Sequence, residues 1–337
     1  MKRYVNIGNK KVGEGHSVFI IAEAGVNHNG SLRLAKKMVG VAKSVGADAI
    51  KFQTFKTEGL VVKRGPQFNM LRQLELNKRD FKALSDYCRK KKIIFLSTPF
   101  DSNSSYFLYK LGVPAFKIAS GELTNVPLLQ QVAGYIKPVI LSTGMSTLKE
   151  VVEAVKVIYS AGNRALVLLH CTSNYPAKYS DVNLRAMDTL KKKFDTPVGY
   201  SDHTKGLEVS VAAVARGANI IEKHFTLDRT LPGPDHKASL EPDELKSFVN
   251  AIRNTEKAMG DGIKKPCYSE DRIKKIARKS IVAACDIPRG SVLTEDMLSI
   301  KRPGRGIEPR YLSRFIKKRT IVNIKKDQVF TWEKVII

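Results

Sequence analysis

The 337-residue sequence lacks the features that would assign it to a membrane, secreted or zinc-binding class. It has no uninterrupted apolar run of about 18 residues, so we expect no membrane-spanning helix. Its N-terminus, MKRYVNIGNKKVGEGHSVF, has no apolar stretch behind its charges, so we expect no signal peptide. Its four cysteines show no CxxC spacing, which argues against a zinc site and a disulfide framework and predicts a cytoplasmic protein.

Acidic residues are also scarce. The chain has 32 Asp and Glu against 58 Lys and Arg, a net charge of +26, and residues 261–337 hold 19 basic and 9 acidic residues. Such an excess is typical of a solvated basic surface or of a protein that attracts an anionic partner. Because no aromatic-interleaved basic stripe, zinc-finger spacing or RNP-type motif accompanies it, we do not expect nucleic acid to be the partner.

Short apolar, β-branched runs alternate with helical patterns through most of the chain. The segment 32–46 is one such helix, with Leu34, Met38 and Val41 on one face and lysines on the other. Several helical patterns end in glycine before the next run, as expected at a helix C-terminus. The eight runs predicted to be strands are Val18–Ala22, Ala49–Phe52, Ile93–Ser97, Ala115–Ile118, Val139–Ser142, Ala165–His170, Val198–Tyr200 and Asn219–Lys223.

Eight strands that alternate with helices predict an α/β protein with a (β/α)₈ TIM barrel. A doubly wound open sheet is the alternative, but it should carry a glycine-rich phosphate loop after its first strand. The first strand here continues into EAGVNHNG instead, which favours the barrel.

The chain is too long for one ordinary core, which predicts a large and a small domain. We expect a catalytic barrel in residues 1–260, closed by a helix over 241–260. The polar, charged segment 261–279 is interpreted as a linker. Residues 280–337 show short β patterns with PRG and KRPGRG turns, which predicts a small β-rich domain.

Polar residues follow nearly every predicted strand. In a barrel, such residues meet at the carboxyl ends of the strands, where active sites lie. Burying so many polar groups at one rim is costly unless they face a polar ligand. The residues in question are Glu23, Asn27, His28, Lys51, Gln53, Ser97, Thr98, Lys117, Ser120, Glu122, Ser142, Thr143, His170, Cys171, Thr172, Ser201, Asp202, His203, Glu222 and His224.

Lys51 and Lys117 lie in otherwise apolar runs, and buried lysines need a partner. An anionic ligand is the favoured partner, because hydroxyl groups near the same strand ends add hydrogen-bond donors for a phosphate. Internal pairing of the lysines with Glu23 or Glu122 is the alternative. The hydroxyl groups belong to Thr98, Ser120, Ser142 and Ser201.

His203 and His224 follow neighbouring strands of the predicted barrel. They could converge on one divalent ion beside Glu23 and a water molecule, in an open site that suits Mn²⁺, Mg²⁺ or Fe²⁺ better than a structural zinc. The pair alone is equally compatible with two unrelated histidines.

Several segments together resemble the sialic acid synthase family, which contains the N-acetylneuraminate synthases and related bacterial nonulosonic acid synthases. The resemblance covers essentially the whole chain in order, and the segment with KRPGRGI looks like the family's C-terminal antifreeze-like (SAF) domain. The segments are FIIAEAGVNHNGS, AIKFQT, FLSTPFD, FKIASGELTN, ILSTGMST, LLHCTSNYP, GYSDHT and IEKHFTLDRTLPGPDHKAS.

The resemblance implies a condensation of phosphoenolpyruvate with an N-acetylmannosamine-type sugar, which gives a nine-carbon 2-keto acid and phosphate. It implies Mn²⁺ or Mg²⁺ on His203 and His224, and a domain-swapped homodimer in which Arg302 of one subunit enters the barrel of the other. The positions that it assigns to phosphoenolpyruvate are Lys51, Thr98, Lys117, Ser120, Ser142 and Ser201, with Gln53 beside them. Those that it places around the sugar or the reacting carbons are Glu23, Glu122, Tyr175 and Asp235.

Two other interpretations stay open at the sequence level. Another barrel aldolase or keto-acid synthase that uses phosphoenolpyruvate or pyruvate would share the lysines, although the C-terminal domain argues against a plain aldolase. A binding protein that holds an acidic polymer with its basic tail would share the charge. The motifs SGE and LPGPDHKAS look more like those of synthases of the neuraminic or legionaminic type than those of the pseudaminic type.

Overall fold

A computed structural model of the chain describes residues 4–334. The chain divides into two compact units, residues 1–260 and 261–337, which are described separately. Among the described residues, no helix has the length and apolar character that a membrane crossing requires.

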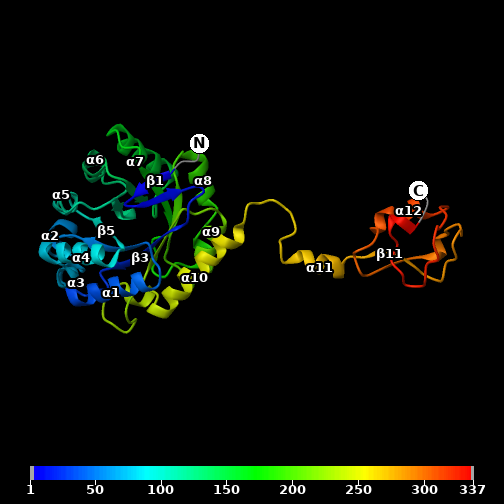
Figure 1. Cartoon of the computed structure of the whole chain (residues 1–337). Coiled ribbons are helices and arrows are strands. Elements are labelled where there is room, and N and C mark those ends of the chain that lie inside the picture. Colours follow the sequence, from blue (N-terminus) through cyan, green and yellow to red (C-terminus); the bar gives the residue numbers. More distant parts are fainter. Residues whose placement is uncertain (1–3, 335–337) are drawn as a thin grey trace. The chain divides into compact units, whose positions relative to one another are not determined.

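The first unit is built on a parallel eight-stranded sheet with the neighbour order β5-β4-β3-β10-β9-β8-β7-β6. The end strands β5 and β6 also lie next to each other, so the sheet forms a nearly closed barrel (Figure 1). This confirms the predicted fold. The strands are β3 (Phe19–Gly25), β4 (Ala49–Thr54), β5 (Ile94–Pro99), β6 (Phe116–Ile118), β7 (Val139–Ser142), β8 (Leu166–Cys171), β9 (Val198–Asp202) and β10 (Ile220–His224).

Helices surround the strands of the first unit (Figure 1). A continuous apolar layer packs their inner faces against the outward residues of the strands, for example Met38 of α1 and Phe248 of α10. This burial is the main stabilising term of the fold. The helices are α1 (Leu32–Ser44), α2 (Thr57–Leu60), α3 (Phe68–Leu74), α4 (Lys78–Lys91), α5 (Ser102–Leu111), α6 (Val126–Gly134), α7 (Leu148–Ser160), α8 (Ala186–Lys193), α9 (Glu208–Ala215) and α10 (Pro242–Met259).

An N-terminal hairpin, β1 (Tyr4–Ile7) with β2 (Lys10–Gly13), was not expected from the sequence. Its side chains Val5, Ile7 and Val12 join the apolar cluster that fills the barrel interior. That cluster consists of inward residues near the amino ends of the strands, such as Phe19 and Leu96. The hairpin therefore closes the amino-terminal end of the barrel.

A second feature at this end ties α10 to the strands. Arg253 donates to Asp48 Oδ2 at 2.6 Å and to the Val18 carbonyl at 2.7 Å. Asp48 also accepts from the backbone N–H of Ile20 at 3.0 Å. The closing helix expected over 241–260 is thus fixed by a partly buried ion pair.

The second unit contains a small antiparallel pair, β11 (Ser280–Ala283) with β12 (Leu298–Lys301), a short helix α12 (Leu312–Phe315) and its own apolar core. Within the segment interpreted as a linker, the structure has the helix α11 (Glu270–Ala277). The N–H of Gly304 donates to the Lys275 carbonyl at 2.9 Å, so the end of α11 is attached to this unit.

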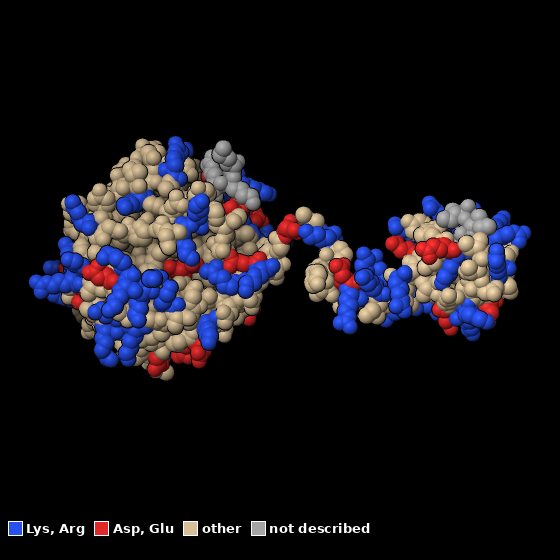
Figure 2. Space-filling model, viewed as in Figure 1, with Lys and Arg blue, Asp and Glu red and all other residues tan. Residues whose placement is uncertain are grey.

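Lys and Arg outnumber Asp and Glu on the visible face of both units (Figure 2). The basic side chains are spread over several helices rather than aligned in one stripe (Figure 2). This distribution agrees with a solvated basic surface.

Candidate active site

A cavity of about 300 Å³ lies at the carboxyl ends of the barrel strands. Each parallel strand contributes inward residues at this rim, because side chains alternate between the inside and the outside of a strand. Eleven of the fourteen predicted site residues line it: Glu23, Lys51, Gln53, Thr98, Lys117, Ser120, Ser142, Tyr175, Ser201, His203 and His224.

Two lysines and two carboxylates form a buried charge cluster at the base of this cavity. Lys51 Nζ lies 2.8 Å from Glu23 Oε2 and 3.7 Å from Glu222 Oε2, and Lys117 Nζ lies 3.6 Å from Glu222 Oε1. All four side chains are almost fully buried. The internal pairing considered as an alternative is therefore present, with Glu222 rather than Glu122 as the second acid.

Burial and neighbouring charges shift the pKa values of the two acids in this cluster in opposite directions. Burial raises the pKa of Glu23 to about 8, against the opposing effect of Lys51. Burial would also raise the pKa of Glu222, but the charges of Lys117 and Lys51 lower it to about 2. The pKa of Lys117 is lowered by burial, whereas Glu222 and Glu23 outweigh burial at Lys51 and raise its pKa.

Hydroxyl groups surround the two ammonium groups. Lys117 donates to Ser142 Oγ at 2.6 Å and Lys51 to Thr98 Oγ1 at 3.1 Å. Ser120 Oγ accepts from the N–H of Gly144 at 3.0 Å. A Cβ at Gly144 would lie 2.4 Å from the Ser173 hydroxyl and 2.9 Å from that of Ser120, so a side chain there would displace these hydroxyl groups.

His203 and His224 lie at the edge of the cavity with their ring centroids 5.6 Å apart. His203 Nδ1 donates to the Thr172 carbonyl at 2.7 Å, which leaves the lone pair on Nε2. His224 Nδ1 is buried without a hydrogen-bond partner, 3.8 Å from Asp235 Oδ2. Burial lowers the pKa of both histidines, so both are neutral near pH 7.

This arrangement fits a divalent cation at an open position, because neutral imidazoles and a nearby carboxylate are suitable ligands. Within residues 4–334, no group of three or more His, Cys, Asp or Glu side chains is arranged to hold a metal. A bound ion would therefore take its remaining ligands from water and substrate, as catalytic ions commonly do.

Three predicted site residues do not line the cavity. Asp235 lies beside it, near His224, and burial raises its pKa to about 6. Glu122 accepts from its neighbour Asn125 at 2.6 Å. Arg302 follows β12 in the second unit.

Glu222 is the most important residue to which the sequence assigned no role. It stands two positions before His224 on β10, so the alternation of a strand places both on the inner face. That spacing was the signal that could have identified it. Phe100, Cys171 and Ser173 also line the cavity.

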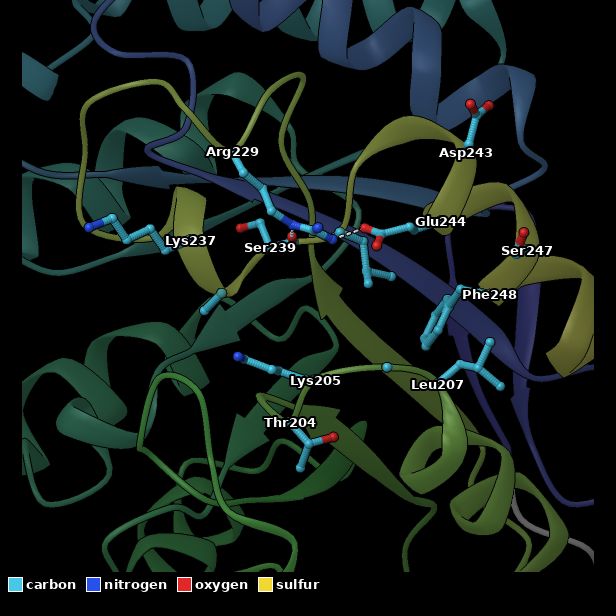
Figure 3. Close-up of a pocket in the computed structure, with 13 residues that line it drawn as sticks. Thr204, Lys205, Leu207, Arg229, Lys237, Ser239, Asp243, Glu244, Ser247 and Phe248 are labelled. Carbon is cyan, nitrogen blue, oxygen red and sulfur yellow. Dashed lines mark hydrogen bonds and ion pairs between the residues drawn. The ribbon is translucent and has the colours of Figure 1, made fainter.

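A larger cavity of about 600 Å³ lies between the segments that follow β9 and β10 and the start of α10 (Figure 3). It contains none of the predicted site residues. Arg229, one of the three cations that line it, already pairs with Glu244 and donates to the Ser239 carbonyl (Figure 3). The smaller cavity, with its buried lysines, is therefore the candidate active site.

A parallel barrel with buried charges and neutral histidines at the carboxyl ends of its strands defines a (β/α)₈-barrel enzyme. Comparison with known proteins identifies the family. The NeuB family model matches residues 38–264, and the SAF domain model matches residues 278–336. The chain belongs to the NeuB family, and it is an enzyme of the kind formed by the N-acetylneuraminate and related nonulosonic acid synthases.

Similar proteins match the chain over nearly its full length. It is 49% identical to the uncharacterized protein MJ1065 of Methanocaldococcus jannaschii, over 98% of each chain. It is 47% identical to the N,N'-diacetyllegionaminic acid synthase of Legionella pneumophila, over 97% of each chain. The crystal structure of the N-acetylneuraminic acid synthetase of Leptospira borgpetersenii, in complex with citrate, shares 41% identity with a TM-score of 0.77, and covers 81% of this chain and 95% of that one.

Proposed function

We propose that this enzyme condenses phosphoenolpyruvate with an N-acylated mannosamine-type sugar, in a metal-dependent reaction that gives a nine-carbon 2-keto acid and phosphate. The methylene carbon of phosphoenolpyruvate attacks the sugar aldehyde and forms the new C–C bond. Water adds to the former enol carbon, and the tetrahedral intermediate expels phosphate by C–O cleavage. Relatives named as synthases of such acids support this proposal.

The observation that carries the proposal is the pair of buried lysines among hydroxyl groups. Lys117 with Ser142, and Lys51 with Thr98, present donors to one small cavity. Phosphoenolpyruvate carries a phosphate and a carboxylate, and charge-assisted hydrogen bonds are the strongest way to hold both. The lysines and hydroxyls would fix its orientation and stabilise the negative charge that moves onto phosphate.

His203 and His224 would hold a divalent ion, Mn²⁺ or Mg²⁺. When bound, such an ion polarises a carbonyl group as a Lewis acid. Glu23 carries a proton near neutral pH because of its raised pKa, so it can donate to an oxygen in the cavity. Asp235, with Oδ2 3.8 Å from His224 Nδ1, would accept a hydrogen bond from a sugar hydroxyl or water.

For the remaining contacts we propose that Tyr175 and Glu122 contribute around the sugar and that Gln53 contributes beside phosphoenolpyruvate. We further propose a domain-swapped homodimer in which Arg302 of the partner subunit completes the site. The sugar that we favour is a 2,4-diacetamido-6-deoxy sugar, because the relative named as a diacetyllegionaminic acid synthase is 47% identical to this chain.

A phosphate-release screen tests the proposal. N-acetylmannosamine, its 6-phosphate and the 2,4-diacetamido-6-deoxy sugars are each supplied with phosphoenolpyruvate, with and without Mn²⁺. We expect phosphate only when phosphoenolpyruvate, a sugar and metal are all present, and fastest release with the diacetamido sugar. Phosphate release that does not require a sugar contradicts the proposed reaction.

A second candidate is an aldolase that forms a Schiff base with pyruvate. It is favoured by the lowered pKa of Lys117, because a less basic lysine is a better nucleophile at neutral pH. Borohydride added with pyruvate would trap such an enzyme covalently. We expect no trapping, because Lys117 is held by Ser142 and faces Glu222.

A further inference from the structure

Two buried charged residues stand directly behind the candidate active site and take no part in it. Along β9 and β10, Ser201, His203, Glu222 and His224 line the cavity. The intervening residues Asp202 and Lys223 point to the opposite side of the sheet, as strand alternation requires. Both are 1% exposed, although a buried Lys–Asp pair is weak evidence for stability by itself.

Asp202 and Lys223 form a network in which nearly every polar atom has a partner. Lys223 Nζ lies 3.0 Å from Asp202 Oδ2 and donates to the Thr204 carbonyl at 2.5 Å. Asp202 Oδ1 accepts from the N–H of Thr204 at 2.9 Å and from its hydroxyl at 2.7 Å. Asp202 Oδ2 accepts from the hydroxyl of Ser210, on α9, at 2.7 Å. The network therefore holds the peptide groups on both sides of Thr204, the residue that follows His203.

The position of this network in the sheet is informative. The backbone ladder between β10 and β9 ends at the pair Lys223 and Asp202. His203 follows immediately after β9, and His224 is the last residue of β10, where its ladder partner is Glu23 of β3. The side-chain pair thus connects the two strands at the point where their backbone pairing stops and the two histidines begin.

We propose that Lys223 and Asp202 are positioning residues that fix the spacing of His203 and His224 for one shared divalent ion. This inference deepens the proposed function, on which it rests, because that function supplies the ion. The pair acts through the backbone: Lys223 holds the Thr204 carbonyl and Asp202 the Thr204 N–H, so the loop after β9 cannot move away from β10. Removing the contacts that support metal ligands typically weakens metal binding roughly 10- to 100-fold. A loss of this size is expected when the Asp202–Lys223 pair is removed.

A purely structural role for the pair makes a different prediction. If the pair only stabilised the barrel, its loss would lower the melting temperature without a specific effect on metal binding. Arg253→Met provides the matched control, because it breaks the Arg253–Asp48 pair at the opposite end of the same barrel. The control and the test variants should both lose stability, but only the test variants should lose metal affinity.

The experiment is a calorimetric titration of the full-length protein with Mn²⁺, followed by one with phosphoenolpyruvate. We expect Lys223→Met and Asp202→Asn to bind Mn²⁺ roughly 10- to 100-fold more weakly than the wild type. Their affinity for phosphoenolpyruvate should stay within about threefold, because Lys51 and Lys117 are on other strands. Arg253→Met should bind both ligands as the wild type does.

Two further variants distinguish a specific loss of Mn²⁺ affinity from a loss caused by misfolding. Ser210→Ala removes one hydrogen bond from Asp202 and leaves the ion pair in place, so a smaller loss of about two- to fivefold in Mn²⁺ affinity is expected. The double variant Asp202→Leu with Lys223→Met replaces the pair by apolar side chains, which commonly restores stability. It should regain melting temperature but not Mn²⁺ affinity.

The outcomes separate this inference from the proposed function. If the wild type binds no divalent ion, the proposed metal dependence fails, and the positioning role fails with it. If the wild type binds Mn²⁺ and the Asp202 and Lys223 variants bind it equally well, the positioning role alone is overturned. A loss of Mn²⁺ affinity in Arg253→Met as large as that in Lys223→Met would also overturn it.

Discussion

The two buried lysines differ in the number of acidic side chains that lie beside them. Lys51 lies near both Glu23 and Glu222, whereas Lys117 is 3.6 Å from Glu222 and hydrogen-bonded to Ser142. Lys117 therefore has the greater capacity to bind an additional anion. Removing Lys51 instead leaves Glu23 without its nearest cation and Glu222 with Lys117 alone.

This difference predicts separate effects of the two Lys→Met changes. Lys117→Met should weaken phosphoenolpyruvate binding roughly 100-fold, because charge-assisted contacts are lost. It should cost less stability than Lys51→Met, because Lys51 still faces Glu222. Lys51→Met should lower the free energy of unfolding by about 3 kcal/mol. Calorimetry with phosphoenolpyruvate and urea unfolding measure the two effects. Equal loss of affinity and of stability in both variants would contradict this division of roles.

Glu23 predicts an unusual dependence of stability on pH. Its pKa is raised from 4.5 to about 8 by burial, so the folded protein keeps a proton that the unfolded chain releases. The stabilisation from this proton is complete below about pH 4.5 and is lost as the pH rises to about 8. Glu23→Gln should remove a pH-dependent decline of roughly 5 kcal/mol from the free energy of unfolding.

Urea unfolding of the ligand-free protein across this pH range measures the effect. Glu153→Gln, on the exposed side of α7, is the control and should keep the wild-type dependence. A Glu23→Gln variant with the same slope as the wild type would show that Glu23 is ionised throughout.

The sequence indicated most of the residues that line the site, but not which acid pairs with the two lysines. Strand ends identified Lys51, Lys117, His203 and His224, because polar residues after apolar runs are conspicuous. Strand alternation alone did not show that Glu222 lies between the lysines. That contact depends on how β10, β4 and β6 close around one axis, which is a three-dimensional property.

Close packing inside the barrel predicts that a methyl group added to β9 destabilises the fold. A Cβ at Gly199 of β9 would lie 2.5 Å from the Ile220 carbonyl and 2.7 Å from Leu169 Cδ2. Gly199→Ala should therefore lower the free energy of unfolding by about 2 kcal/mol. Gly134, at the end of α6, has no heavy atom within 4 Å of the corresponding position.

Gly134→Ala is thus the matched control, and it should leave stability unchanged or raise it by about 0.5 kcal/mol. Chemical unfolding of both variants checks the pair. A stable Gly199→Ala protein would mean that β9 and β10 can separate, which the close contacts argue against.

Elements with strong periodicity were predictable and short ones were not. All eight barrel strands were located within a few residues, because each is an apolar run between helical patterns. The hairpin of β1 and β2 was missed because it buries only three apolar side chains, those of Val5, Ile7 and Val12, too few to form a pattern. The helix α11 was missed because it buries no side chain, so its sequence lacks an apolar face that packs.

For the whole molecule, the proposed exchange of Arg302 between subunits can be tested by mixing variants. Arg302→Ala and Lys117→Met should each be inactive or severely impaired alone, with phosphoenolpyruvate still bound by the former. If Arg302 acts in the partner's barrel, a reassembled equal mixture should have intact sites in about a quarter of its barrels.

Phosphate release before and after reversible dissociation of the mixture measures this recovery. The control is Arg302→Ala reassembled with itself, which should gain nothing. No recovery in subunits shown to have exchanged would place Arg302 at the barrel of its own chain or outside the reaction.

The hairpin that seals the amino-terminal end of the barrel has a kinetic consequence. Reactants and products must pass through the same opening, at the carboxyl ends of the strands. The amino-terminal end of the barrel is filled by Val5, Ile7 and Val12, which pack against the inward residues of the strands. Of two molecules bound in the cavity, the one nearer the opening would have to leave before the inner one. Turnover should accordingly follow a compulsory order, with the first reactant to enter occupying the innermost position.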